Sequence, residues 1–201
     1  FAEGAFNAAF VPLFAQELAT HGRAAAREFV ERVFGVMLVL LLALTFVVEV
    51  YMGEVMGLVA GGFADDPEKF ALAVDFARLT FPYLLFVSLA TMLSGILNTL
   101  NRFVAAAAAP ILLNIILISA LIAVALDWVP DPGLALSWAV LIAGIGQFIW
   151  LAIACGRAGL LPRVPRLVMS PRVRRLFALM GPGILGAGVY QINVLIGVRL
   201  A

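Results

Sequence analysis

Four long stretches without a single charged residue constrain the fold of this 201-residue chain more than any other feature. A helix needs about 20 residues to cross the roughly 30 Å hydrocarbon core of a bilayer. Each stretch reaches that length, and none alternates apolar with polar residues as a membrane strand would. The stretches are residues 79–101, 103–126, 133–156 and 176–198. They predict membrane-spanning α-helices.

Two shorter apolar stretches extend this pattern towards the N-terminus. Residues 33–48 continue past Glu49 as a further span, whereas residues 4–16 are too short alone and are expected to form part of a helix. Only 12% of the residues are charged, against about 25% in soluble domains. We therefore predict an all-α, polytopic helical bundle in one membrane domain. The expected helices, one partial and five complete, are about 1–19, 33–59, 76–101, 103–126, 133–156 and 174–199.

Arginine is distributed unevenly among the connections between these spans. The segments 20–32, 102 and 157–175 hold ten of the thirteen basic residues, whereas 61–75 and 127–133 are mainly acidic. Loops rich in Arg and Lys remain in the cytoplasm. The three basic connections are therefore expected inside and the two acidic connections outside, as in a multi-pass protein of the inner membrane.

The residues typical of metal or covalent chemistry are scarce. His21 is the only histidine and Cys155 the only cysteine, and the chain has no Gly-rich phosphate-binding loop. A net charge of +1 gives no reason to expect nucleic acid as a partner. We expect no catalytic residue, no metal and no cofactor. Because the first residue is Phe1 and not Met, the chain is expected to begin inside a longer protein.

Polar groups at membrane depth are the candidate functional residues, because each raises the free energy unless it is paired or hydrated. For the amides, interhelical hydrogen bonds and the lining of a wet cavity both remain open, and Gln147 is a further amide of this kind. Arg78 could instead extend to the outer interface. A buried Glu3 would need a cationic partner, which the preceding part of the protein would supply. The candidate cavity residues are Glu3, Arg78, Asn98, Asn114, Gln191 and Asn193.

Several motifs, in order along the whole chain, resemble the MurJ/MviN lipid II flippases. The most specific are Phe-Ala-Glu-Gly-Ala-Phe at residues 1–6 and Gly-Ile-Leu-Asn-Thr-Leu-Asn-Arg-Phe at 95–103. Thr-Phe-Pro-Tyr at 80–83, Ala-Pro-Ile-Leu-Leu-Asn at 109–114 and Met-Gly-Pro-Gly-Ile-Leu-Gly at 180–186 agree with them.

The resemblance implies a fold and a function. The family belongs to the multidrug/oligosaccharidyl-lipid/polysaccharide exporter superfamily, whose members place two lobes of helices around a central cavity that opens alternately to each side. This chain would supply the second to seventh helices, most of the first lobe, with Glu3 beside the cavity. The family's known cavity arginines would lie outside this chain.

The expected function is to flip a lipid-linked peptidoglycan precursor across the bacterial inner membrane, without making or breaking a covalent bond. Membrane lipids and cell-wall synthesis proteins are candidate partners. The alternatives are an exporter of drugs or lipid-linked polysaccharide units, a membrane-embedded transferase, and a scaffold for the cell-wall machinery. A transferase would need clustered acids or histidines, which the chain lacks.

Overall fold

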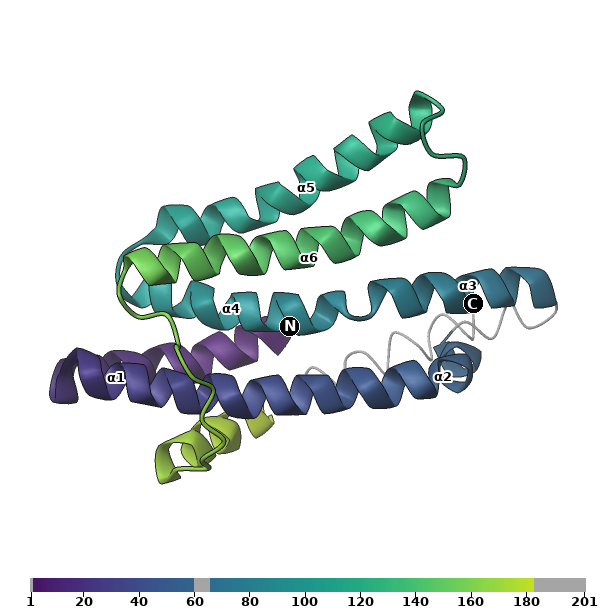
Figure 1. Ribbon diagram of the computed structural model, residues 1–201. Helices are drawn as coiled ribbons and strands as arrows, with labels where there is room; N and C mark the ends of the chain where they lie inside the picture. Colours follow the sequence, from purple (N-terminus) through teal and green to yellow (C-terminus); the bar gives the residue numbers. More distant parts are fainter. Residues whose placement is uncertain (1, 60–65, 183–201) are drawn as a thin grey trace.

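A computed structural model describes residues 2–59 and 66–182, and all the regular structure in these two ranges is helical (Figure 1). The prediction of an all-α polytopic bundle is confirmed. Four helical segments are long and apolar enough to cross a membrane, namely Gly4–Val50, Pro67–Thr99, Phe103–Ala125 and Pro132–Arg157. The helices are α1 (Ala2–Val50), α2 (Met52–Val59), α3 (Pro67–Thr80), α4 (Tyr83–Thr99), α5 (Phe103–Ala125) and α6 (Pro132–Arg157).

Helix α1 is a hairpin whose two arms meet at Gly22. This glycine has φ 79° and ψ −178°, a backbone conformation that residues with a Cβ rarely adopt. The chain reverses there, and the rings of Phe10 in the first arm and Phe29 in the second stack with centroids 6.0 Å apart. The two arms therefore lie side by side (Figure 1).

The predicted loop at 20–32 is wrong, because apart from Gly22 this segment is helical. Residues 23–32 are rich in Ala, Arg and Glu, which favour helix, and Arg32 pairs with Glu28 one turn earlier at 2.6 Å. Ala26 and Phe29 are buried on one face of this turn. The second arm therefore begins well before the predicted start at residue 33.

The outer ends of two predicted spans also differ in the structure. The span expected at 33–59 is divided at Tyr51 into α1 and the short α2, which turns away from the axis of α1 (Figure 1). The span expected to begin at 76 begins at Pro67, behind Asp66, whose side chain accepts a hydrogen bond from the backbone N–H of Lys69 at 3.2 Å. The prediction rested on uncharged stretches, so it left out the charged first part of α3, although that part is helical. Pro82, which has no N–H to donate, lies between α3 and α4.

Helices α5 and α6 form an antiparallel hairpin with nearly the bounds predicted. Asp131 caps α6 by accepting from the N–H of Leu134 at 3.0 Å. Two side chains of α6 donate to backbone carbonyls of α5: Gln147 Nε2 to Ala109 at 2.9 Å and Trp150 Nε1 to Ala105 at 3.0 Å. The structure thus assigns an interhelical hydrogen bond to Gln147. Small alanines on α5 permit this close approach.

The shared core lies where the α1 hairpin, α4 and the end of α6 meet. The largest fully buried side chains there include Phe10, Phe14, Met92, Leu97 and Leu151. Helix α5 contributes only Ala109 to the buried set, and many of its large side chains, among them Ile111, Ile115 and Ile118, are exposed along an apolar face suited to lipid.

After α6 the chain crosses α1, and a further helix begins at Pro171 and is described as far as Pro182. Ser170 caps it by accepting from the N–H of Val173 at 3.3 Å. The rest of the span predicted at 174–199 lies outside the described residues, so the count of six spans stays a prediction.

Candidate functional site

The predicted cavity residues do not gather at one place in the described structure. Arg78 is exposed near the end of α3, Asn98 is half-buried near the end of α4, and Asn114 is exposed on α5. Arg78 and Asn98 are separated by roughly 30 Å along the chain's helical path, at about 1.5 Å per residue. Glu3 lies in the first turn of α1, but its side chain is not among those described, and Gln191 and Asn193 lie outside the described residues. A common cavity for these six residues stays a prediction.

A groove of about 320 Å³ runs between the α1 hairpin and α4. Phe6 comes from the first arm, Met37 and Leu40 from the second, and Phe177 from the helix that begins at Pro171. Ser88 and Thr91 of α4 are the hydroxyl groups among its lining residues, which are otherwise apolar. The groove is therefore an apolar surface with a narrow polar strip on α4.

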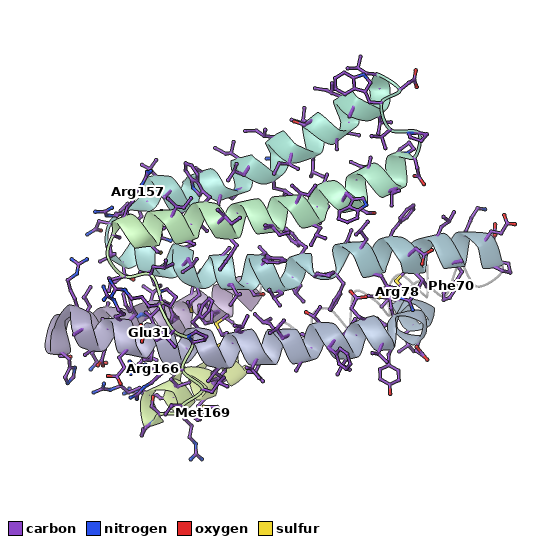
Figure 2. The ribbon with its side chains drawn as sticks, viewed as in Figure 1. Glu31, Phe70, Arg78, Arg157, Arg166 and Met169 are labelled. Atoms are coloured by element: carbon purple, nitrogen blue, oxygen red, sulfur yellow. The ribbon has the colours of Figure 1, made fainter. Side chains whose placement is uncertain are left out.

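The three basic connections meet at one end of the bundle, opposite the acidic turns (Figure 1). Arg157 and Arg166 lie at this end, whereas Arg78 and Phe70 lie towards the other end (Figure 2). Arg23 donates to the carbonyl of Ala158 at 2.5 Å, and Arg27 donates to the carbonyl of Gly159. These bonds join the turn of the α1 hairpin to the end of α6.

Residues 158–170, hereafter the strap, cross the second arm of α1. The backbone of Arg166 passes so close to Gly35 that a Cβ on this glycine would lie 2.7 Å from the Arg166 carbonyl oxygen. Arg166 pairs with Glu28 at 3.1 Å and with Glu31 at 3.2 Å, and its N–H donates to the Glu31 carbonyl at 3.1 Å. The Glu31 side chain is only 7% exposed. Glu28 and Glu31 thus hold the strap against α1.

A third carboxylate, in the first arm of α1, also pairs with a distant arginine. Glu17, also almost fully buried, accepts from Arg172 at 2.5 Å and lies 3.6 Å from His21 Nδ1. The pair joins the first arm of α1 to the helix that follows the strap.

Sequence reasoning missed these three acids, because it treated the basic segments only as a signal of sidedness. The spacing of Glu17 with His21 and of Glu28 with Arg32, each four residues apart, was the available clue. The strap is therefore fixed by ion pairs and does not lie free in solvent.

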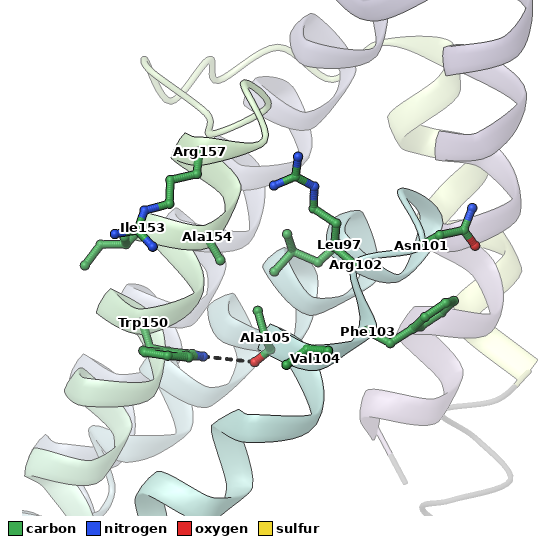
Figure 3. A pocket seen from close by; sticks show the side chains of 10 residues that line it. All are labelled: Leu97, Asn101, Arg102, Phe103, Val104, Ala105, Trp150, Ile153, Ala154 and Arg157. Carbon is green, nitrogen blue, oxygen red and sulfur yellow. Dashed lines mark hydrogen bonds between the residues drawn. The ribbon is translucent and has the colours of Figure 1, made fainter.

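A pocket of about 450 Å³ lies at the same basic end, where α4 ends, α5 begins and α6 ends (Figure 3). Arg102 comes from the turn between α4 and α5, and Arg157 from the last turn of α6. Trp150 lies on the pocket wall and remains 44% exposed, although its ring N–H donates a hydrogen bond to the Ala105 carbonyl. No acid lines the pocket. The pocket is a cationic recess in an apolar surface.

The opposite end carries the acidic turns. Asp66 pairs with Lys69 at 2.9 Å, and this side-chain hydrogen bond holds the pKa of Asp66 below its ordinary value. Trp128, 75% exposed in the turn between α5 and α6, has the amphipathic ring typical of a membrane interface. Within 2–59 and 66–182 no group of three His, Cys, Asp or Glu side chains is placed to hold a metal ion.

Comparison with known proteins shows which family the chain belongs to. The sequence model of the family described as lipid II flippase MurJ matches residues 1–201. The chain belongs to the MurJ family of lipid II flippases.

Individual MurJ relatives agree along the whole chain. A probable lipid II flippase MurJ of Rhizobium meliloti is 47% identical over 207 residues, covering 100% of this chain and 38% of the relative. One of Rhizobium tropici is 48% identical with the same coverage. The lipid II flippase MurJ of Burkholderia cenocepacia is 35% identical over 204 residues, 100% of this chain and 39% of the relative.

The chain thus spans about two fifths of the length of these MurJ relatives. The family resemblance inferred from the motifs is confirmed. Membership of MurJ together with four apolar helices of spanning length places the chain in the bacterial inner membrane, as predicted.

Proposed function

We propose that the protein containing this chain moves lipid II from the cytoplasmic to the periplasmic leaflet by alternating access, and that this chain forms most of its N-terminal lobe. The observation that carries the proposal is the match of residues 1–201 to a family named for lipid II flipping. The relatives reported above bear the same name, which favours this cargo over drugs or lipid-linked polysaccharide units.

The charge distribution of the bundle supports this function. The head of lipid II carries a pyrophosphate, and moving such an anion through hydrocarbon without partners costs many kcal/mol. The described end of the bundle that holds Arg102, Arg157 and Arg166 is rich in cations, and the opposite end is rich in acids. An anionic head is therefore attracted first to the basic end, which the topology predicts to be cytoplasmic.

The central cavity would form only when the second lobe packs against this one. We propose that Glu3, Arg78, Asn98, Asn114, Gln191 and Asn193 face that cavity or its approaches. Rocking of the two lobes would carry the head across while the lipid tail stays in hydrocarbon. No covalent bond of the cargo changes, so the protein is a transporter and not an enzyme. Proteins that synthesise peptidoglycan are the proposed partners, because they consume the flipped lipid.

The test uses the full-length protein in cells whose own lipid II flippase is depleted. The wild-type protein is expected to restore growth and to expose lipid II on the periplasmic face, measured by its cleavage with an enzyme added from outside. Glu3→Ala is expected to abolish both effects at equal protein abundance in the membrane. The control Glu68→Ala changes an exposed acid at the start of α3 and is expected to behave as wild type.

One result would contradict the proposed function, and another would contradict only the placement of Glu3. If the wild-type protein restores no exposure of lipid II although it is inserted, the function is wrong. If Glu3→Ala supports normal growth, the function stands and Glu3 is removed from the cavity.

A further inference from the structure

Five arginines at the basic end have no side-chain partner within the described structure, and of these only Arg102 and Arg157 line a common pocket; the others are Arg163, Arg174 and Arg175. Arg32, Arg166 and Arg172 are paired with carboxylates, and Arg23 and Arg27 donate to backbone carbonyls. Among residues 4–59 and 66–182, no ion pair or hydrogen bond of this kind involves the side chain of Arg102 or Arg157. Both line the same pocket of about 450 Å³.

Two arginines from different elements border this pocket. Arg157 approaches from α6 on one side and Arg102 from the α4–α5 turn on the other (Figure 3). Both guanidinium groups border the pocket, so each attracts an anion that enters it. The backbone N–H groups in the first turn of α5 add to this preference, because no side chain caps that helix. The polar half of the site therefore favours a phosphate.

The rest of the pocket is apolar and open to the side. Phe103, Val104 and Ile153 are 56%, 84% and 51% exposed, and Trp150 lies beneath the arginines with its N–H bonded to Ala105. An exposed apolar face continues from there along α5 through Ile111 and other large side chains. A free inorganic anion would leave this surface unused, whereas an amphiphile would cover it with its acyl chains.

The pocket lies apart from the groove beside α1. Helices α5 and α6 lie on one side of α4, and the α1 hairpin, with the groove and Glu3, lies on the other (Figure 1). Helix α5 buries only Ala109 in the described bundle and forms its edge. A lipid in this pocket would therefore belong to the surrounding bilayer.

We propose that Arg102 and Arg157 bind the phosphate of an anionic phospholipid of the cytoplasmic leaflet, whose acyl chains lie along the exposed face of α5 and α6. Bound there, the lipid joins the end of α4, the start of α5 and the end of α6, and holds the basic end at the depth of the headgroups. This binding site is distinct from the lipid II cavity and does not depend on transport.

The test compares two matched double variants of the full-length protein in detergent micelles. Arg102→Gln/Arg157→Gln removes the pocket's charges, and Arg163→Gln/Arg174→Gln removes two exposed charges of the same end that do not line the pocket. Native mass spectrometry during titration with phosphatidylglycerol, phosphatidylcholine or lipid II gives the affinity of each protein for each lipid. A parallel titration adds inorganic phosphate as the competitor.

One basic residue near a lipid surface strengthens binding about five-fold, so the loss of both pocket arginines is expected to weaken phosphatidylglycerol binding roughly thirty-fold. The control variant is expected to change it less than about two-fold, and phosphatidylcholine binding is expected to be equal in all proteins. Arg102→Lys/Arg157→Lys, which keeps the charge, is expected to retain most of the affinity and so excludes misfolding as the cause of a loss.

Fluorescence locates the lipid independently. Phosphatidylglycerol brominated near the headgroup is expected to quench the signal contributed by Trp150, taken as the difference between wild type and Trp150→Phe. The proposal is overturned if the two double variants lose affinity equally, if inorganic phosphate alone saturates the site without lipid, or if the pocket variant loses lipid II and keeps phosphatidylglycerol. The first two outcomes leave the proposed transport of lipid II untouched, and the third would place the two arginines on the cargo route instead.

Discussion

At the scale of single residues, the basic end is organised by a few charged side chains and by the glycine at position 35, which has no side chain. Glu17, Glu28 and Glu31 neutralise arginines that follow them by more than one hundred positions in the chain. Gly35 leaves room for the backbone of Arg166 against α1. Because the contact at Gly35 is with backbone, a small shift of a flexible side chain cannot relieve it.

Gly35→Ala is therefore expected to destabilise the protein. Overpacking of this kind costs about 1–3 kcal/mol, more than the gain of up to roughly 1 kcal/mol from replacing Gly by Ala in a helix. Thermal unfolding of the full-length protein in detergent is expected to show a lower midpoint. Gly57→Ala in α2 is the matched control, since nothing lies within 4 Å of its added Cβ, and its midpoint should be unchanged or higher. A midpoint for Gly35→Ala equal to that of the control would show that the strap does not cross here.

At the scale of elements, the uncharged spans and the charged segments behave differently. Helices α5 and α6 lie almost where their uncharged runs predict them. The beginning of α3 and the turn of α1 do not, because helix formation depends on propensity, caps and burial and continues through charged residues. The strap is a non-helical element whose course depends on ion pairs with α1.

Glu31→Gln is expected to loosen the strap without unfolding the helices. The change removes the ion pair with Arg166 and weakens the hydrogen bond from the N–H of Arg163, at 3.4 Å; hydrogen bonds to charged groups contribute about 1.5–3 kcal/mol. Trypsin is expected to cleave after Arg163 and Arg166 several-fold faster than in the wild type. Glu68→Gln, on an exposed turn, is the control and should leave the rate unchanged. Equal rates in both variants would mean that the strap is held by other contacts.

At the scale of the whole molecule, the segregation of charge gives the bundle a direction. The Arg-rich turns gather at one end, and Asp66, Lys69 and the α5–α6 turn lie at the other. The positive-inside tendency predicts that the strap faces the cytoplasm. The structure shows that the basic segments share an end, and the side of the membrane stays a prediction.

Cysteine labelling in intact cells tests this orientation. Lys69→Cys in the full-length protein is expected to react with a membrane-impermeant thiol reagent added outside, whereas Val168→Cys in the strap is expected to react only after permeabilisation. Both side chains are exposed, so access to water is comparable. The native Cys155 is buried and serves as the background. Labelling of Val168→Cys alone in intact cells would reverse the orientation.

The sequence by itself determined that the chain is a helical membrane bundle, and it predicted which runs cross the membrane and which turns lie on the same side of it. Those properties depend on local composition: a run of apolar residues has the same affinity for lipid whatever lies beside it. Its motifs also indicated the family that the comparisons confirmed.

Only the tertiary structure decided that the strap lies across Gly35, that Glu17, Glu28 and Glu31 pair with distant arginines, and that Arg102 and Arg157 share a pocket. The structure also places Arg78, Asn98 and Asn114 on three different helices, although the sequence grouped them together as polar residues in or beside apolar runs. A side chain's partner depends on how helices far apart in the chain pack and rotate, and that information lies in the contacts between helices.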